Sequence, residues 1–218
     1  DVTRDEIRRD LQARFGAWTA PAAPGSAVPQ APASPPVEAR RIERNLTQAT
    51  VSLARPGIRQ DHPDYFPLVV ANYILGGGSA SRLYTKVREE RGLAYSVYSG
   101  LGPGGYGSSY FVGLQTRLEA VDEAVRLVKE ELARMTREPV TARELELAKA
   151  YLIGSYPLRT DTSGKMAGLL VAVEENRLGL DWPDRFKAGI SRVTAADIKR
   201  VAATYMDPAT FSSVTVGK

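Results

Sequence analysis

The segment from Leu75 to Tyr98 constrains the fold more than any other part of the chain. A helical pattern ends at the triplet Gly76–Gly78, and a second helical pattern then runs to about Arg91. We expect Ser79 to cap the second helix and Gly92 to end it with a left-handed backbone. Because a strand pattern follows directly, the chain must pass from helix to helix to strand within a short distance.

Two polar side chains of this segment could share one surface. Arg88 lies near the end of the expected second helix, and Tyr95 lies seven residues later, at the start of the expected strand. A guanidinium and a phenol side by side form a fixed pair of donors for a carbonyl or a developing oxyanion. The alternative is that Arg88 pairs with Glu89 or Glu90 at a solvated helix end and that Tyr95 is an ordinary sheet residue.

The remaining pattern predicts an α+β fold with a mainly antiparallel sheet and helices packed on one face. Strands are expected at about 47–55, 93–101, 107–117 and 211–216, and helices at about 61–75, 79–91, 118–135, 141–157, 161–178, 182–190 and 194–205. The middle two strands are joined by residues 102–107, which are typical of a hairpin turn. Hairpin strands and blocks of consecutive helices favour this class over a parallel sheet.

The first 39 residues differ in composition from the rest. Residues 1–16 predict an amphipathic helix, with Ile7 and Leu11 on one stripe. Residues 17–39 are rich in proline and alanine and carry almost no charge, so we expect an extended linker. The main domain is expected at 40–218.

Composition excludes several classes of protein. With 218 residues, 43% of them hydrophobic, the chain can bury a sizeable core. The absence of cysteine excludes disulfides, thiol catalysis and cysteine-bound metal. No apolar run is long enough for a membrane span, and the first residues lack the pattern of a signal peptide. Periplasm and cytoplasm both fit this composition.

The net charge of +4 does not predict nucleic-acid binding. Basic residues alternate with acidic ones along the expected helices instead of forming blocks. Such alternation is typical of solvated helix faces. Nucleic acid is therefore not an expected partner.

Several stretches resemble the pitrilysin/insulinase-type zinc peptidases, a family that includes the mitochondrial processing peptidases and the core proteins of respiratory complex III. The main stretch is YILGGGSASRLYTKVREERGLAYSVYSG; DHPDYFPLVVANYIL overlaps its start, and VTAADIKRVAATYMDPATFSSVTVG lies near the end of the chain. The resemblance covers about 40–218. Residues 1–38 are similar to the last helix of a preceding half and the linker between halves.

The resemblance implies two similar α+β halves around a chamber, with a His-x-x-Glu-His zinc motif in the N-terminal half. This chain is similar to the C-terminal half only. Its one histidine, His62, has no second ligand nearby in the sequence, so we expect no metal in this chain and zinc in the partner half. We expect His62 to be a surface residue at a helix start.

The resemblance also implies roles for particular residues. Arg88 and Tyr95 match a pair that the C-terminal half donates to the composite active site. The resemblance places Gly77, Gly78 and Ser79 near the chamber wall, where they could contact substrate, although the residues themselves favour a plain hinge between two helices. The strand after Tyr95 could pair with an extended peptide by edge addition.

Three interpretations of the whole chain remain open. It is the non-catalytic C-terminal domain of a single-chain zinc peptidase, an inactive subunit beside a separate zinc subunit, or a structural scaffold without catalysis. In the first two, the partners are a zinc-bearing half or subunit and a peptide substrate. An apolar surface left uncovered in the isolated chain could also drive self-association.

Overall fold

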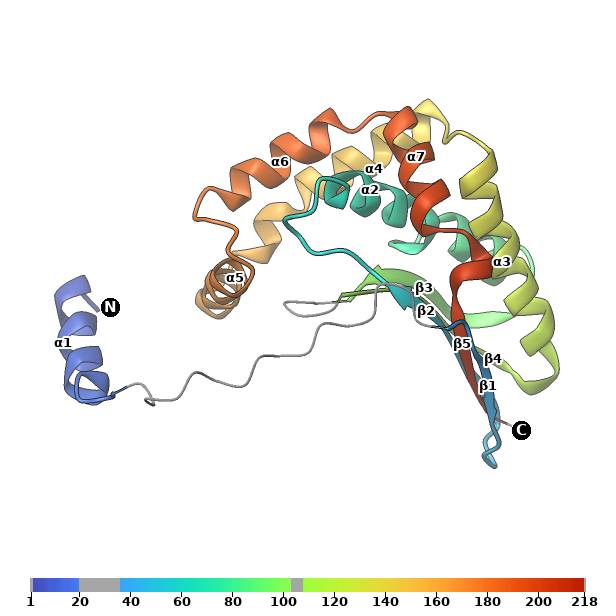
Figure 1. The fold of residues 1–218 in the computed structure, drawn as a ribbon, viewed down its shortest axis with the longest axis horizontal. Helices are drawn as coiled ribbons and strands as arrows, with labels where there is room; N and C mark the ends of the chain where they lie inside the picture. The colour runs from blue at the N-terminus through green and yellow to red at the C-terminus, as the bar shows by residue number, and fades with distance from the viewer. Residues whose placement is uncertain (1, 20–35, 103–107, 218) are drawn as a thin grey trace.

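The computed structural model describes residues 2–19, 36–102 and 108–217, and one mixed sheet organises them (Figure 1). The strands are β1 Ala39–Ile42, β2 Gln48–Pro56, β3 Ala94–Leu101, β4 Ser109–Arg117 and β5 Ser212–Val216. Their order is β1-β5-β2-β4-β3, and every neighbouring pair is antiparallel except β1 with β5. The expected α+β class and mainly antiparallel sheet are confirmed, and β3 lies at an edge.

Helices arch over one face of the sheet, as Figure 1 shows. They are α2 Tyr65–Gly76, α3 Val121–Arg137, α4 Ala142–Gly154, α5 Ser163–Glu175, α6 Trp182–Arg192 and α7 Ala195–Tyr205. A short π-helix, η1 (Tyr84–Glu89), lies between α2 and β3, and 3₁₀ turns occupy Leu118–Ala120, Tyr156–Arg159 and Pro208–Thr210.

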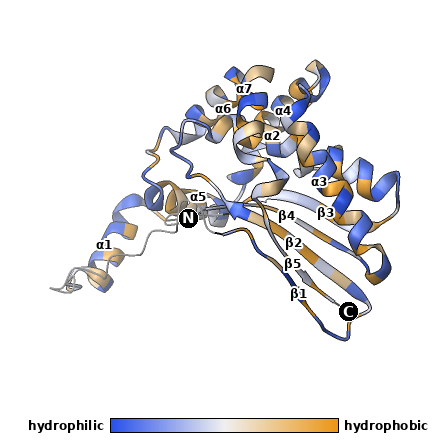
Figure 2. Ribbon diagram, turned by 45° about the vertical axis from the view of Figure 1, so that its right-hand side comes forward, coloured by the Kyte–Doolittle hydropathy of each residue, from blue (hydrophilic) through white to orange (hydrophobic). Residues whose placement is uncertain are grey.

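The core lies between the sheet and these helices. In β2, Ala49, Val51 and Leu53 are buried and alternate with exposed polar residues, as the period of two requires. In α3, the buried positions step by three and four, and they include Leu127 and Val128. Burial of each large aliphatic side chain contributes about 1.5–3 kcal/mol, so a charge at Leu53 would disrupt the fold. Figure 2 shows the alternation of hydropathy along the strands.

Three helices begin at a capping box. Thr3, Thr141 and Thr194 each accept a hydrogen bond from the backbone three residues later, where an acidic side chain bonds back to the threonine. Each box satisfies donors that a helix start leaves unpaired. These helix starts were therefore predictable from sequence alone.

The segment after the glycine triplet departs from the prediction. Ser79 was expected to cap a helix, but Ser79 lies in a turn that the hydrogen bond from Ser81 N to Gly78 O closes at 3.1 Å, and helical backbone begins only at Arg82. Ser79 is therefore wrong as the cap. The helix is also mostly π-helical, because the Glu90 amide bonds to Thr85 O, five residues back.

The strand β1 was not expected. Its sequence, Ala39-Arg-Arg-Ile42, has no alternating apolar pattern, and all four residues are exposed. It forms because β5 offers an open edge for parallel pairing. The helix α2 also begins at Tyr65 rather than at 61, since residues 61–64 form turns.

Two expectations fall largely outside the described residues. Residues 20–35 contain most of the expected linker, and residues 103–107 contain most of the expected hairpin turn. The helix α1 (Arg4–Phe15) is described and buries none of its residues. Figure 1 shows α1 apart from the sheet.

None of the helices in the described ranges combines the length and the apolar character needed to span a bilayer.

Candidate functional site

The π-helix η1 holds Arg88 next to a buried anchor. Val87 is buried, and its carbonyl accepts a hydrogen bond from the Leu93 amide at 3.0 Å. Gly92 has a φ of +59°, which lets the chain reverse from η1 into β3. The prediction that Gly92 ends the helix in the left-handed region is confirmed. Arg88 therefore lies near the end of η1, where the buried Val87 and the reversal at Gly92 hold the backbone in place.

Tyr95 lies in a β-bulge at the start of β3. Ala94 pairs with Thr116 and Ser96 pairs with Gln115, so Tyr95 is an additional residue with no partner on β4. In a regular strand, Tyr95 would share the face of Val97, which is only 5% exposed. The bulge instead leaves Tyr95 78% exposed. Bulges near functional sites commonly redirect a side chain in this way.

The structure brings Arg88 and Tyr95 together, with Tyr84 as a third member. The Arg88 guanidinium carbon lies 4.6 Å from the centre of the Tyr84 ring and 5.6 Å from that of Tyr95. Both distances are within the range of cation–π attraction. Arg88 Nη1 also donates a hydrogen bond to the Tyr84 hydroxyl oxygen. The guanidinium therefore lies between two phenol groups.

The alternative pairing of Arg88 with Glu89 or Glu90 does not occur. Glu90 instead accepts a hydrogen bond from Lys86 at 2.7 Å. Within the described ranges, no carboxylate lies at ion-pair distance from Arg88. The positive charge of Arg88 is therefore not neutralised by any described carboxylate of this chain.

A half-buried ion pair joins the start of the helical segment that leads into η1 to α4. Arg82 donates two hydrogen bonds to Glu144, of 2.7 and 3.0 Å, and the two side chains are 11% and 29% exposed. Burial alone would raise the pKa of Glu144, but hydrogen bonds from Arg82 and from the Thr141 backbone lower this pKa to about 2. The carboxylate is therefore charged at neutral pH.

The glycine triplet packs closely rather than forming an open loop. An ideal Cβ on Gly76 would lie 2.5 Å from Ser99 Oγ, so the end of α2 contacts β3 directly. A Cβ on Gly77 would lie 2.7 Å from the Tyr73 Cα, and one on Gly78 would lie 3.2 Å from the Tyr73 ring. These close contacts are enough to explain why each position is a glycine, whether or not the residue also contacts a ligand.

The predicted substrate-binding residues Gly77, Gly78 and Ser79 do not all line the same surface. Gly77 lines a hollow between α2 and α4, whereas Gly78 and Ser79 do not. Neither Arg88 nor Tyr95 lines this hollow. The predicted site residues therefore belong to two separate places on the described surface.

Sequence reasoning missed Tyr84 and Asn72. Tyr84 lies four residues before Arg88, the spacing at which helical side chains meet, so this signal was present. Asn72 joins α2 to β3: Ser99 Oγ donates to Asn72 Oδ1 at 2.7 Å, and Asn72 Nδ2 donates to Ser99 O at 3.3 Å. No local signal indicates the second contact, because the two residues are far apart in sequence.

The residues present do not fit a zinc site. No group of three or more histidine, cysteine or acidic side chains in the described ranges is placed to hold a metal. His62 lies exposed before α2, where its Nδ1 accepts a hydrogen bond from the Asp64 amide at 3.1 Å. Peptidase zinc takes imidazole ligands, and the sequence has one histidine.

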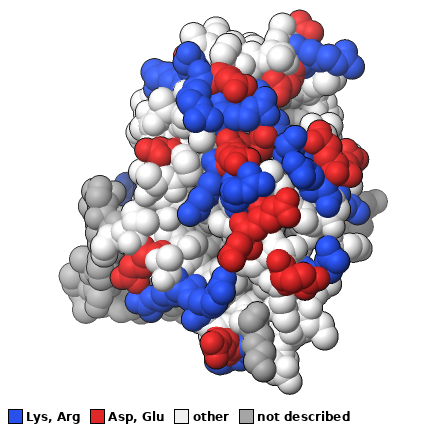
Figure 3. All heavy atoms as spheres, turned by 90° about the vertical axis from the view of Figure 1, so that its right-hand side faces the viewer, with Lys and Arg blue, Asp and Glu red and all other residues white. Residues whose placement is uncertain are grey.

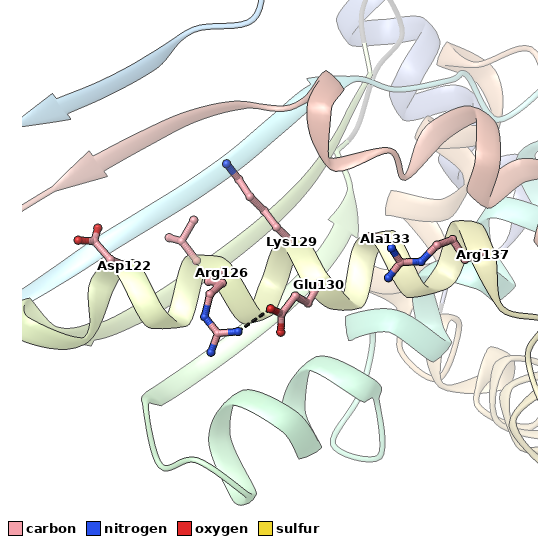
Figure 4. Close-up of a pocket in the computed structure, with 7 residues that line it drawn as sticks. Asp122, Arg126, Lys129, Glu130, Ala133 and Arg137 are labelled. Atoms are coloured by element: carbon pink, nitrogen blue, oxygen red, sulfur yellow. Dashed lines mark hydrogen bonds and ion pairs between the residues drawn. The ribbon is translucent and has the colours of Figure 1, made fainter.

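A second hollow lies along α3 but does not resemble a binding site. Figure 4 shows its lining residues spaced along this one helix, with Arg126 paired to Glu130. A single helix cannot enclose a ligand. Figure 3 shows acidic and basic side chains interleaved over this face of the molecule.

Comparison with known proteins places the chain in a family. The model of the peptidase M16 inactive domain matches residues 1–152. The chain is 32% identical over 170 residues to the uncharacterized zinc protease YmxG of Bacillus subtilis, covering 75% of this chain and 39% of that protein. It is 32% identical over 218 residues to an uncharacterized zinc protease of Streptomyces coelicolor, covering 93% of this chain and 45% of that protein. The chain thus spans less than half the length of these relatives.

Comparison with solved structures supports the same family assignment. The M16 inactive domain of Pseudomonas fluorescens superposes with a TM-score of 0.86 at 31% identity, over 100% of this chain and 52% of that one. A chain of complex III from Candida albicans superposes with a TM-score of 0.83, over 100% of this chain and 53% of that one. At 15% identity this second match shows a shared fold only. The resemblance to pitrilysin/insulinase-type peptidases is confirmed, and the chain belongs to the peptidase M16 inactive-domain family.

Proposed function

We propose that this chain is the non-catalytic part of a two-part zinc peptidase and that it donates Arg88 and Tyr95 to a composite active site. Family membership and two relatives named as zinc proteases support the proposal. Those relatives have room for a second, zinc-bearing part, because this chain covers less than half of each. The partner part supplies the zinc, which polarises the scissile carbonyl when bound there.

The observation that carries the proposal is the pair formed by the half-buried Arg88 and the exposed Tyr95, in which Arg88 has no carboxylate partner among the described residues. Tyr84 accepts one hydrogen bond from Arg88, which leaves other guanidinium N–H groups able to donate to substrate. The Tyr95 hydroxyl extends into solvent from the bulge. When the partner part closes over the peptide, these donors would face a developing oxyanion in a space with little water.

The test is peptidase activity of the chain combined with its zinc-bearing part, with zinc present. We expect activity only in the combination. Arg88→Ala or Tyr95→Phe should lower kcat/KM by about 100- to 1000-fold, the usual cost of removing an oxyanion donor. Tyr98→Phe, on the same strand, is the matched control and should leave the rate unchanged. Activity of this chain alone would overturn the proposal.

A second candidate function is a structural scaffold, which the shared fold with a complex III chain favours. In that case Arg88→Ala and Tyr95→Phe would leave the peptidase rate of the assembled enzyme unchanged. A third arrangement keeps the composite site but divides it between two gene products. Co-purification with a separate zinc-bearing subunit would support that arrangement, and a zinc motif encoded upstream in the same gene would contradict it.

A further inference from the structure

One hollow in the described surface lies away from Arg88 and Tyr95. We name it the α2–α4 hollow; it has a volume of about 560 Å³. Its walls come from α2, α4, the end of β3 and the 3₁₀ turn Tyr156–Arg159, and they include Tyr73, Leu101, Tyr151, Leu158 and Arg159. This volume is in the range of ligand sites, and the exposed lining combines polar groups with aromatic and aliphatic side chains.

The wall of the α2–α4 hollow is aromatic and open. Tyr73 and Tyr151 stack with their ring centres 4.7 Å apart and their planes 23° from parallel. Burial and the neighbouring Tyr151 raise the pKa of Tyr73, so its phenol stays neutral. Leu158 also lines the hollow, is 62% exposed and leaves an apolar surface uncovered. Such a wall favours an apolar or aromatic side chain.

One charge faces this space. Arg159 is the only charged residue of the lining, since Gln60, Asn72 and Ser155 are neutral. Its guanidinium carbon lies 5.3 Å from the centre of the Tyr156 ring and 5.2 Å from that of Phe186. Across the described ranges no carboxylate pairs with Arg159. A ligand for this hollow should therefore carry an anion beside its apolar group.

The edge strand β3 connects the hollow to the Arg88 and Tyr95 pair. Tyr95 is the second residue of β3, and Leu101, its last residue, lines the hollow. Six residues of extended chain span about 20 Å. In the described ranges β4 is the one strand paired with β3, and of the backbone on the other side only Ser99 O is known to be engaged, by Asn72 Nδ2 at 3.3 Å. An extended peptide can therefore pair with the rest of that edge. Such a peptide would reach both places.

We infer that the α2–α4 hollow is a peptide subsite that binds an apolar side chain next to a carboxylate, about six residues from the bond held at Tyr95. As part of a peptidase, this subsite rests on the function proposed above. The carboxylate can be the free C-terminus of a peptide or an acidic side chain, because Arg159 recognises the same chemistry in both.

Peptide binding to the 218-residue chain alone tests the inference. Fluorescence anisotropy would compare a labelled peptide ending in Phe with a free carboxylate and the same peptide amidated. A second pair would carry internal Phe-Glu or Phe-Gln, both amidated. We expect at least one carboxylate peptide to bind about tenfold more tightly than its neutral counterpart. Which pair responds identifies the source of the carboxylate.

Arg159→Gln should remove this tenfold difference, and Arg143→Gln, an exposed arginine on α4 outside the hollow, should keep it. Equal binding of all four peptides, or equal loss in both variants, would overturn the inference. Circular dichroism confirms that both variants fold. Because binding needs no zinc part, failure here is separate from failure of the composite site.

Kinetics of the assembled enzyme would separate a binding role of Arg159 from a catalytic role of Arg88. There, Arg159→Gln should raise KM and leave kcat unchanged for peptides with the anchor at the matching distance, because a remote binding contact is lost. Arg88→Ala should mainly lower kcat. A fall in kcat alone for Arg159→Gln would contradict a role in binding.

Discussion

At the scale of single residues, Tyr84 and Gly76 determine how the candidate site is held in place. Tyr84 supplies both a ring and a hydrogen-bond acceptor to Arg88, which keeps the long guanidinium side chain in one place. A fixed side chain loses less conformational entropy when it binds a ligand. Gly76 has a structural role, because it lets the end of α2 touch β3 at Ser99.

Gly76→Ala should destabilise the fold by about 1–3 kcal/mol, as overpacking does. The new Cβ would lie 2.5 Å from Ser99 Oγ and 2.7 Å from Ser99 N, and the second of these atoms belongs to the backbone of β3, which cannot turn aside as a flexible side chain can. Urea denaturation measures the change. Gly168→Ala in α5 is the control; no atom lies within 4 Å of its new Cβ. It should stabilise the helix by about 0.5–1 kcal/mol, and equal effects at both sites would refute this explanation.

At the scale of elements, two irregularities create the candidate site. The π-helix η1 and the bulge at Tyr95 flank the turn at Gly92, and together they direct Arg88 and Tyr95 toward each other. The pair Arg82–Glu144 attaches the residues directly before η1 to α4, so the helical segment that carries Arg88 is held at its start as well. Irregular backbone of this kind recurs at functional sites.

The attachment of η1 to α4 should depend on pH. The pKa of Glu144 in the folded chain is about 2, below its usual 4.5. The stabilisation is therefore complete above pH 4.5 and is lost as pH falls from about 4.5 to 2. Glu144→Gln should cost on the order of 2 kcal/mol at pH 7 after solvent screening and progressively less at acidic pH.

Urea midpoints measured across this pH range for the wild type and Glu144→Gln check the prediction. Glu130→Gln removes an exposed pair with Arg126 and should cost less than about 1 kcal/mol at any pH. If the cost of Glu144→Gln did not shrink at low pH, the ion pair would not be the cause.

At the scale of the whole molecule, apolar surface remains uncovered. Of the residues of α5, only Val173 is buried. Exposed apolar side chains extend over α4 and α5: Leu147, Tyr151, Met166, Leu170 and Val171. Surface of this kind usually marks an interface, and the proposed zinc-bearing part would cover it.

The isolated chain should therefore self-associate. Sedimentation velocity should show a weight-average mass that rises with protein concentration. The double variant Met166→Lys/Leu170→Lys should shift the chain toward monomer, because charges on an interface carry a desolvation cost. Glu174→Lys, on the same helix, should not have this effect. A wild-type chain that stays monomeric at every concentration would contradict the prediction.

Local sequence determined most of the elements of this fold. Threonine followed three residues later by an acidic residue set three helix starts, the left-handed requirement set Gly92, and apolar periodicity identified β2 and α3. The local sequence also indicated that Arg88 and Tyr95 could share one surface. All of these signals act within a few residues, so a single sequence contains them.

Only the tertiary structure decided the rest. The strand β1 exists because β5, far along the chain, offers an edge, and Tyr95 leaves the core face because β4 fixes the register on both sides of the bulge. The α2–α4 hollow gathers Gly77, Tyr151 and Arg159 from separate segments. Such contacts depend on which distant surfaces meet, and no local propensity encodes that choice.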